Sequence, residues 1–244
     1  MQGLRLNQAA CLDGALQFHK WRYFDDDNKL QGPGNRTPVW FITGCSTGFG
    51  LELARQAMGH GYRTVVTARD PGPLERHASA SNVLVLKLDV TQHDQAAAAI
   101  KAAEERFGGI DVLVNSAGIG YFAAVEESEE AEVRKMFEVN VFGLGRMIHA
   151  VLPGMRKRRK GFIVNFSSIG GLRLFPAVGH YNATKFAVEG LSEALWQEVE
   201  PLGIKVMLVE PSGFRTDWAG RSSSLRCSMA TTATWFTATP RQCW

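Results

Sequence analysis

Three glycines in a short run, set between an apolar segment and an amphipathic one, place the strongest constraint on how this 244-residue chain folds. The run is TGCSTGFG, residues 43–50. The preceding PVWFIT, at 38–43, is apolar and β-branched like a buried parallel strand, and afterwards Leu51, Ala54 and Met58 recur at helical spacing. Strand, glycine loop and helix in this order aim free backbone N–H groups and the positive helix end at a phosphate. The context therefore favours a nucleotide site over a plain tight turn.

The alternation of strand-like and helix-like segments continues to residue 209 and sets the fold class. Strands are predicted at 38–43, 63–68, 82–88, 110–115, 161–166 and 204–209, and helices at 48–60, 92–107, 128–158 and 181–200. Apolar runs without polar alternation are typical of parallel strands that are covered on both faces. We therefore predict an α/β fold, a single doubly wound parallel sheet, for a domain of residues 38–220.

The two ends of the chain depart from this alternation. Residues 1–37 show no sustained periodicity, and we interpret them as a flexible N-terminal extension or a misplaced start rather than a second domain. Residues 221–244 are rich in Ser and Thr with scattered tryptophans, and we interpret them as an irregular C-terminal tail.

Charge limits the classes of partner. The formal net charge is only +3, and the one dense basic run, RKRRK at 156–160, falls where a long helix should end. Cations there complement the negative end of the helix dipole, which favours a solvated helix end over a targeting signal or a polyanion patch. We predict no nucleic-acid partner.

Hydropathy and cysteine spacing limit the location. No run reaches the roughly 18 apolar residues of a membrane span, and the first residues lack the apolar core of a signal peptide. The four cysteines show neither metal-ligand spacing nor a disulfide framework. We expect a cytoplasmic protein with no metal site and no membrane span.

The end of the second strand bears on the choice of dinucleotide. An acidic residue there would bind the ribose hydroxyls of NAD, whereas an arginine would meet the 2′-phosphate of NADP. This strand ends VVTARD, with Ala68 at the place of the carboxylate and Arg69 next to it. NADP is therefore preferred over NAD. Two observations oppose this preference: Asp70 next to Arg69 carries a negative charge, and Arg69 could be an ordinary surface arginine.

Two further strand ends carry candidate contacts. Asp89, in LDV, is placed to accept from an adenine amino group, or else to cap the helix after Thr91. Residues 115–118, NSAG, are small enough to let the backbone pass close to a flat ligand, although the same composition makes ordinary turns.

The strongest local pattern is YNATK. Tyr181 and Lys185 are four residues apart at the start of a helix, which places both on one face. An ammonium near a phenol favours the phenolate and lowers the phenol pKa from its usual value of about 10. The pair suits proton transfer, although Tyr-x-x-x-Lys also occurs on helices in a purely structural role.

Ser168 lies thirteen residues before Tyr181, at the carboxyl edge of the sheet, where doubly wound folds bind ligands. Its hydroxyl could hydrogen-bond a carbonyl oxygen and the tyrosine together, whereas Ser167 is better suited to satisfying backbone groups. Asn140 lies within a predicted helix, where asparagine is a poor former. It either supports a local irregularity that holds a water or faces solvent.

Jointly, these motifs resemble the short-chain dehydrogenase/reductase family over residues 38–220. The matching motifs are Thr-Gly-x-x-x-Gly-x-Gly at 43–50, Asn-x-Ala-Gly at 115–118, and then Asn140, Ser168, Tyr181 and Lys185. The resemblance implies a Rossmann sheet of order 3-2-1-4-5-6-7 and hydride transfer between NAD(P) and a carbonyl or alcohol. It also implies a homodimer or homotetramer that pairs through the helices at 128–158 and 181–200.

The resemblance assigns roles to four residues. Tyr181 is the general acid/base, and Lys185 binds the nicotinamide ribose and lowers the tyrosine pKa. Ser168 steadies the substrate oxygen, and Asn140 supports a proton relay. The predicted dinucleotide contacts are Thr43, Gly44, Ser46, Thr47, Gly48, Phe49, Gly50, Arg69, Asp89, Val90, Asn115, Ala117, Gly118, Tyr181, Lys185, Pro211 and Thr216.

The substrate is expected to be a small molecule with a carbonyl or alcohol group. The glycine loop and VVTARD look most like family members that use NADP and reduce lipophilic ketones or hydroxysteroid-like substrates. An apolar substrate pocket is predicted from four residues that could equally be ordinary core: Leu172, Leu174, Phe175 and Phe214.

The sequence departs from the family pattern after the sixth strand. The family usually has Pro-Gly-x-x-x-Thr there, and PSGFRT places Ser212 at the first glycine while Thr216 still matches the nicotinamide contact. Residues 221–244 resemble neither the substrate-covering helices nor the seventh strand, as in a truncated or frame-shifted chain. A cofactor-binding protein with little or no turnover is therefore the alternative to an oxidoreductase.

Overall fold

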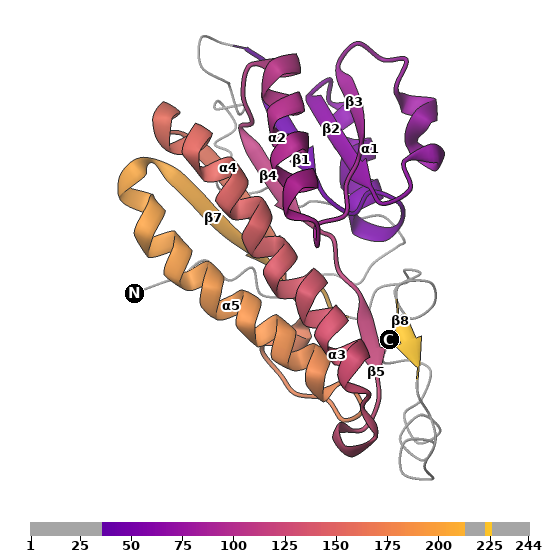
Figure 1. Cartoon of the computed structure of the whole chain (residues 1–244). Coiled ribbons are helices and arrows are strands. Elements are labelled where there is room, and N and C mark those ends of the chain that lie inside the picture. Colours follow the sequence, from indigo (N-terminus) through magenta and orange to yellow (C-terminus); the bar gives the residue numbers. More distant parts are fainter. Residues whose placement is uncertain (1–35, 213–222, 226–244) are drawn as a thin grey trace.

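The computed structural model describes residues 36–212 and 223–225 of the chain. Six parallel strands form the main sheet in the order β3-β2-β1-β4-β6-β7 (Figure 1). These strands are β1 Val39–Ile42, β2 Arg63–Ala68, β3 Val83–Lys87, β4 Val112–Asn115, β6 Gly161–Phe166 and β7 Ile204–Val209. Taken in chain order they are the six predicted strands, so the doubly wound α/β fold and the order 3-2-1-4-5-6 are confirmed.

Five α-helices connect these strands and cover the sheet. They are α1 Gly48–Gly59, α2 His93–Phe107, α3 Glu130–Phe137, α4 Leu144–Arg158 and α5 Gly179–Val199. Helices α2, α4 and α5 lie over one face of the sheet (Figure 1) and share its larger apolar cluster, whereas α1 packs in the second cluster. Four short 3₁₀ helices join these elements: η2 Gly72–His77, η3 Val125–Glu127, η5 Ile169–Gly171 and η6 Glu200–Leu202.

The long helix predicted at 128–158 is interrupted. Between α3 and α4 the chain forms a π-helical segment, η4, over Glu138–Gly143. π-Helical turns inside α-helices are rare and are found mostly at functional sites. The predicted irregularity around Asn140 is therefore present.

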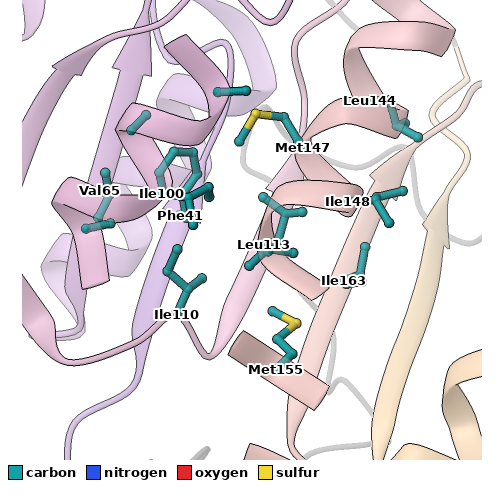
Figure 2. Packing of buried hydrophobic residues seen from close by; sticks show 14 of the residues in the cluster. Phe41, Val65, Ile100, Ile110, Leu113, Leu144, Met147, Ile148, Met155 and Ile163 are labelled. Atoms are coloured by element: carbon teal, nitrogen blue, oxygen red, sulfur yellow. The ribbon is translucent and has the colours of Figure 1, made fainter. Parts of the chain in front are cut away.

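The larger core cluster holds the sheet against α2 and α4. Figure 2 shows Phe41 of the sheet beside Ile100 of α2, and Leu113 and Ile163 of the sheet in the same cluster as Met147 and Met155 of α4. Phe41, Leu113, Ile163, Met147 and Met155 are fully buried. Burial of a side chain of this size stabilises the fold by about 1.5–3 kcal/mol. The core therefore fixes the strands whose ends carry the predicted motifs.

The basic run at 156–160 is a helix end, as predicted. α4 stops at Arg158, and Arg159 caps it in the left-handed conformation at φ 50°. The run is not simply solvated, because the Arg158 guanidinium donates to the Ile110 carbonyl at 2.7 Å and that of Arg159 to the Pro201 carbonyl at 2.7 Å. These hydrogen bonds tie the helix end to the loops beside it.

A second, two-stranded sheet was not predicted. Strand β5, Gly120–Phe122, pairs in parallel with β8, Ser223–Leu225. The prediction of an irregular tail is wrong for these three residues, because a strand this short shows no alternation and forms only where a partner edge lies beside it. Among the described residues β8 does not join the main sheet, and none of their helices is long and apolar enough to cross a membrane.

The start of β1 depends on one buried carboxylate. Asp111 is 5% exposed, and it accepts hydrogen bonds from the Val39 backbone N–H at 2.8 Å and from the Arg36 guanidinium at 3.1 Å. These contacts join β1 to the loop before β4, 72 residues later. The Asp111 carboxylate therefore anchors the start of β1, which lies between β2 and β4 in the sheet.

Replacement Asp111→Ala is expected to lower the free energy of unfolding by about 1–3 kcal/mol, because it leaves a buried backbone N–H without its acceptor. Urea unfolding followed by circular dichroism measures the change. The control is Asp94→Ala on the solvent-exposed start of α2, where the loss should be no more than about 1 kcal/mol. Equal losses in the two variants would contradict the role of Asp111.

Candidate active site

The predicted motifs meet at one edge of the sheet. Strands β1, β4 and β6 are neighbours and run parallel, so their carboxyl ends lie together. The glycine loop follows β1, NSAG begins at the last residue of β4, and Ser167 and Ser168 follow β6. This is the edge at which open parallel sheets bind ligands.

Each glycine of the loop has its own reason to lack a side chain. Gly44 is at φ +71°, and a Cβ there would lie 2.8 Å from the Cα of Ala117. A Cβ on Gly50 would collide with the carbonyl of Gly44, and Gly48 is at φ +61° with open space around it. The loop is therefore pressed against the end of β4 on one side and left open at Gly48 on the other, as a phosphate cradle requires.

Thr43 joins this loop to the end of β4. It is 1% exposed, and its hydroxyl donates to the Val114 carbonyl at 3.2 Å and accepts from Ser116 N–H at 3.0 Å and Ala117 N–H at 3.1 Å. Its hydrogen-bonding capacity is thus used inside the protein. Thr43 holds the two loops in place and does not present its side chain to a ligand.

The other loop residues are more open. Ser46 is exposed, and Thr47 and Phe49 are half-buried. Thr47 is the extended N-cap of α1 and makes no side-chain capping bond, so the first N–H groups of α1 have no side-chain acceptor from the cap. The Phe49 ring packs 5.6 Å from the ring of Phe166 at the end of β6.

The charged residues after β2 and β3 that were predicted to face the dinucleotide make different contacts. Arg69 is exposed directly after β2, and the Asp70 carboxylate accepts from Gly72 N–H at 3.1 Å. Asp89 accepts from the backbone N–H of Thr91 at 3.0 Å and from its hydroxyl at 2.7 Å. The negative charge of Asp70 is therefore directed into its own turn. Asp89 closes a local turn with Thr91 and does not cap the following helix as the alternative predicted, because the N-cap of α2 is Gln92, which makes no side-chain capping hydrogen bond.

Val90, Asn115 and Pro211 lie at or behind the edge. Val90 is buried against Gly143, and the Pro211 carbonyl accepts from Ile169 N–H at 2.9 Å. Asn115, 4% exposed, donates to the Asn165 side chain at 2.9 Å. All three support the edge from within the protein. Thr216 and Phe214 lie outside the described residues.

Asn115 begins a buried polar chain that the sequence did not reveal. The Asn165 amide donates to the Ser192 hydroxyl at 2.9 Å, and Ser192 donates to the Val188 carbonyl at 2.6 Å. The chain ties β4 and β6 to α5 beneath the site. The one sign of this polar chain in the sequence is Asn165, a single asparagine inside an otherwise apolar strand.

Tyr181 and Lys185 lie together in the first two turns of α5, as predicted. They are 8% and 7% exposed, and the Lys185 Nζ is 5.7 Å from the centre of the Tyr181 ring. Lys185 donates to the carbonyl of Phe166, the last residue of β6, at 2.9 Å. This hydrogen bond fixes the ammonium group at the edge of the sheet.

The pKa of Tyr181 does not move as predicted. Burial raises the pKa of Tyr181 to about 12, and the hydrogen bond with Ser168 opposes this rise. Burial lowers the pKa of Lys185 to about 8, and the charge of Glu189 opposes this fall. The expected lowering of the tyrosine pKa is wrong for the protein alone, because burial disfavours both charged forms and the lysine loses its proton before the phenol ionises.

The two serines after β6 match their predicted parts only in part. The Ser168 hydroxyl is hydrogen-bonded with Tyr181 and accepts from Gly170 N–H at 3.1 Å, so it satisfies a backbone group and also faces the tyrosine. Ser167 is 4% exposed, and within the described residues its hydroxyl has no hydrogen-bond partner. Ser168 thus lies beside Tyr181 as predicted, whereas the prediction that the Ser167 side chain satisfies backbone groups is wrong.

Asn140 is buried, so the alternative that it faces solvent is wrong. Its side chain accepts from Ile119 N–H at 2.8 Å and donates to the Ile119 carbonyl at 2.9 Å and the Thr184 hydroxyl at 3.2 Å. A Cβ on Gly118 would lie 3.4 Å from the Asn140 side-chain oxygen and 3.9 Å from the Lys185 Nζ. Asn140 therefore joins η4, the loop after β4 and α5 around the lysine.

The residues predicted to line an apolar pocket differ in how deeply they are buried. Leu172 and Leu174 are 39% and 69% exposed, whereas Phe175 is half-buried and packs with Tyr121 and Tyr181. The first two are therefore available on the surface that follows η5. No group of three or more metal-ligating side chains occurs in the part of the chain that the structure describes.

Comparison with known proteins identifies the family. The model of the short-chain dehydrogenase family matches residues 38–225. An oxidoreductase of Botryotinia fuckeliana is 41% identical over 189 residues, which are 76% of this chain and 69% of that protein. The 3-ketodihydrosphingosine reductase of Bacteroides thetaiotaomicron is 43% identical over 178 residues, 73% of this chain and 64% of that protein.

The chain matches a human protein as well, and it covers only part of the length of its relatives. Human retinol dehydrogenase 8 is 39% identical over 190 residues, 74% of this chain and 60% of that protein. The chain thus spans 60% to 69% of the length of these three relatives.

Solved structures share the fold. A short-chain dehydrogenase from Streptomyces avermitilis has a TM-score of 0.78 at 39% identity, over 85% of this chain and 77% of that one. A Burkholderia phymatum relative was solved with NAD (TM-score 0.72, 32% identity, 75% and 68% covered) and ElxO with NADP (0.71, 33%, 74% and 75%). With its glycine loop, its serine, tyrosine and lysine at one sheet edge, and this family match, the chain belongs to the short-chain dehydrogenase/reductase family of oxidoreductases.

Proposed function

We propose that this protein is an NADP-dependent oxidoreductase that interconverts a carbonyl and an alcohol on a lipophilic substrate. The observation that carries the proposal is the placement of Ser168, Tyr181 and Lys185 side by side at the carboxyl edge, next to the glycine loop. A hydroxyl, a buried phenol and an ammonium are the groups that orient a carbonyl and supply its proton.

The glycine loop fits a dinucleotide. Gly48 leaves open space where a side chain would stand, and the α1 cap leaves N–H groups for a phosphate. The nicotinamide, when bound, supplies or accepts the hydride. One N–H of Lys185 donates a hydrogen bond to the Phe166 carbonyl, and its remaining N–H groups are available to ribose hydroxyls.

The proton chemistry falls to Tyr181. With a pKa of about 12, it is protonated at neutral pH and is suited to donate its proton to the oxygen of a carbonyl being reduced. Ser168, already hydrogen-bonded with the phenol, would hold that oxygen in place. The Lys185 ammonium would stabilise the phenolate that remains, and Asn140 would support proton return from its position between η4 and α5.

The choice of NADP rests on Arg69, which is exposed beyond β2 without an acidic residue at Ala68. A lipophilic substrate is supported by the exposed Leu172 and Leu174 after η5. Two relatives named for lipid-like substrates, 3-ketodihydrosphingosine reductase and retinol dehydrogenase 8, point the same way. A homodimer or homotetramer is supported by the exposed Phe186 and Leu191 on α5.

Replacement Tyr181→Phe is expected to lower the rate of NADPH-dependent ketone reduction by about 10²- to 10⁴-fold, because the proton donor is removed. Loss of absorbance at 340 nm with a hydrophobic ketone measures the rate. The control is Tyr62→Phe, whose ring stacks on Trp40 just before the amino end of β2, away from the carboxyl edge. A protein that binds NADPH but has no activity to lose would support the alternative, a cofactor binder without turnover.

Replacement Arg69→Ala is expected to weaken NADPH binding by roughly ten- to a hundredfold and to leave NADH binding unchanged. Hydrogen bonds to a charged phosphate contribute about 1.5–3 kcal/mol, and only NADPH carries this phosphate. Titration of the melting temperature with each cofactor measures the two affinities. Arg76→Ala, exposed on η2, is the matched control, and equal losses for both cofactors would contradict the role of Arg69.

The rate of reduction is expected to be level below about pH 8 and to fall above it. The Lys185 pKa of about 8 lies below its usual 10.5, so the ammonium is present at lower pH and is lost as pH rises through 8, while Tyr181 stays protonated. The pH profile of kcat/KM checks this. Lys185→Arg, which keeps its charge, should move the fall to higher pH, and a profile level to pH 10 would contradict the assignment.

A further inference from the structure

Helix α5 carries a third buried ionisable side chain in line with the tyrosine and the lysine. Glu189 lies four residues beyond Lys185, as Lys185 lies four beyond Tyr181, so all three share one face of the helix. Glu189 is 7% exposed, as deeply buried as Lys185. The proposed mechanism gives it no part, although burying a carboxylate is costly unless it interacts with a cation or with hydrogen-bond donors.

The chain makes room for this carboxylate. A Cβ on Gly171 of η5 would lie 3.1 Å from both the Cγ and the Oε1 of Glu189, and 2.7 Å from the Ser167 Oγ. The neighbouring Gly170 makes room for Tyr181 in the same way, because a Cβ on Gly170 would lie 3.4 Å from the tyrosine ring. The two glycines of η5 therefore let η5 pack closely against α5 along the line of the three side chains.

Few charged or titratable groups face Lys185. From α5 come Tyr181 and Glu189, and from β6 comes only the Phe166 carbonyl. Asn140 of η4 is neutral. Val206 and Leu208 of β7 pack against the larger core cluster, so the alternation of side chains along the strand directs Glu210, just after β7, to the side of the sheet that α5 covers. Among these residues, Glu189 is the one whose charge raises the pKa of Lys185 against the effect of burial.

We propose that Glu189 is a positioning residue that keeps Lys185 protonated and in place beside Tyr181. The inference rests on the proposed function, in which the lysine acts as a cation. The carboxylate and the ammonium each offset part of the cost of burying the other. Gly171 is part of the same arrangement, because a side chain there would displace Glu189.

The test compares Glu189→Gln with the native chain. The amide keeps the shape and removes the charge, so the alkaline fall in kcat/KM for ketone reduction should begin at least about one pH unit lower. Glu189→Asp should restore much of the native profile. Glu193→Gln, the same change on the exposed side of the next turn, should leave it unmoved. An unshifted profile in a folded, active Glu189→Gln variant would overturn the proposal.

A second measurement does not depend on turnover. Urea midpoints at pH 7 for the native chain, Glu189→Gln, Lys185→Met and the double variant form a double-mutant cycle. If the two charges support each other, the double variant should lose less than the sum of the single losses. An additive cycle overturns the pairing whether or not the chain is active, whereas a coupled cycle in a chain without reductase activity contradicts only the proposed function.

Discussion

The close approach of Gly44 to Ala117 is the contact on which the candidate site depends. Parallel strands bring the ends of β1 and β4 to one edge, and the absent side chain at Gly44 lets the two loops touch there. The Thr43 hydroxyl then holds three backbone groups of the β4 end, from Val114 to Ala117. The glycine loop, which we propose binds a phosphate, and the end of β4 behind it are thus built as one unit.

A second layer of polar contacts holds the catalytic candidates against this unit. Asn140 links η4 to Ile119 and Thr184, and the chain from Asn115 through Asn165 to Ser192 links β4 and β6 to α5. Because hydrogen bonds between buried groups have well-defined geometry, they restrict how α5 can move on the sheet. A reaction that needs a phenol, a hydroxyl and an ammonium in register depends on this restriction.

Burial gives the site its electrostatic character. It keeps the Tyr181 phenol protonated at neutral pH and lowers the pKa of Lys185 to about 8. In the proposed reaction the pair therefore donates a proton well only while the lysine keeps its charge. The carboxylate of Glu189 one turn further on opposes the loss of that charge. The row of Tyr181, Lys185 and Glu189 is therefore better understood as three coupled groups than as a pair.

Local pattern was enough to predict the six strands, the flanking helices and the residues at the carboxyl edge. Periodicity and glycine spacing are properties of short segments. The order of the strands was implied by the resemblance to the short-chain dehydrogenase/reductase family. The same patterns placed Ser168, Tyr181 and Lys185 correctly on their elements. They also marked Asn140 as out of place in a helix.

Tertiary contacts decided the rest, because burial and long-range pairing leave no local pattern. Strand β5 lies about a hundred residues before its partner β8, and neither segment is long enough to show alternation. The direction of the Tyr181 pKa depends on how deeply the phenol is covered, which spacing on a helix does not reveal. Glu189 is an ordinary helical glutamate in the sequence, and only the packing of η5 against α5 makes it a buried charge beside Lys185.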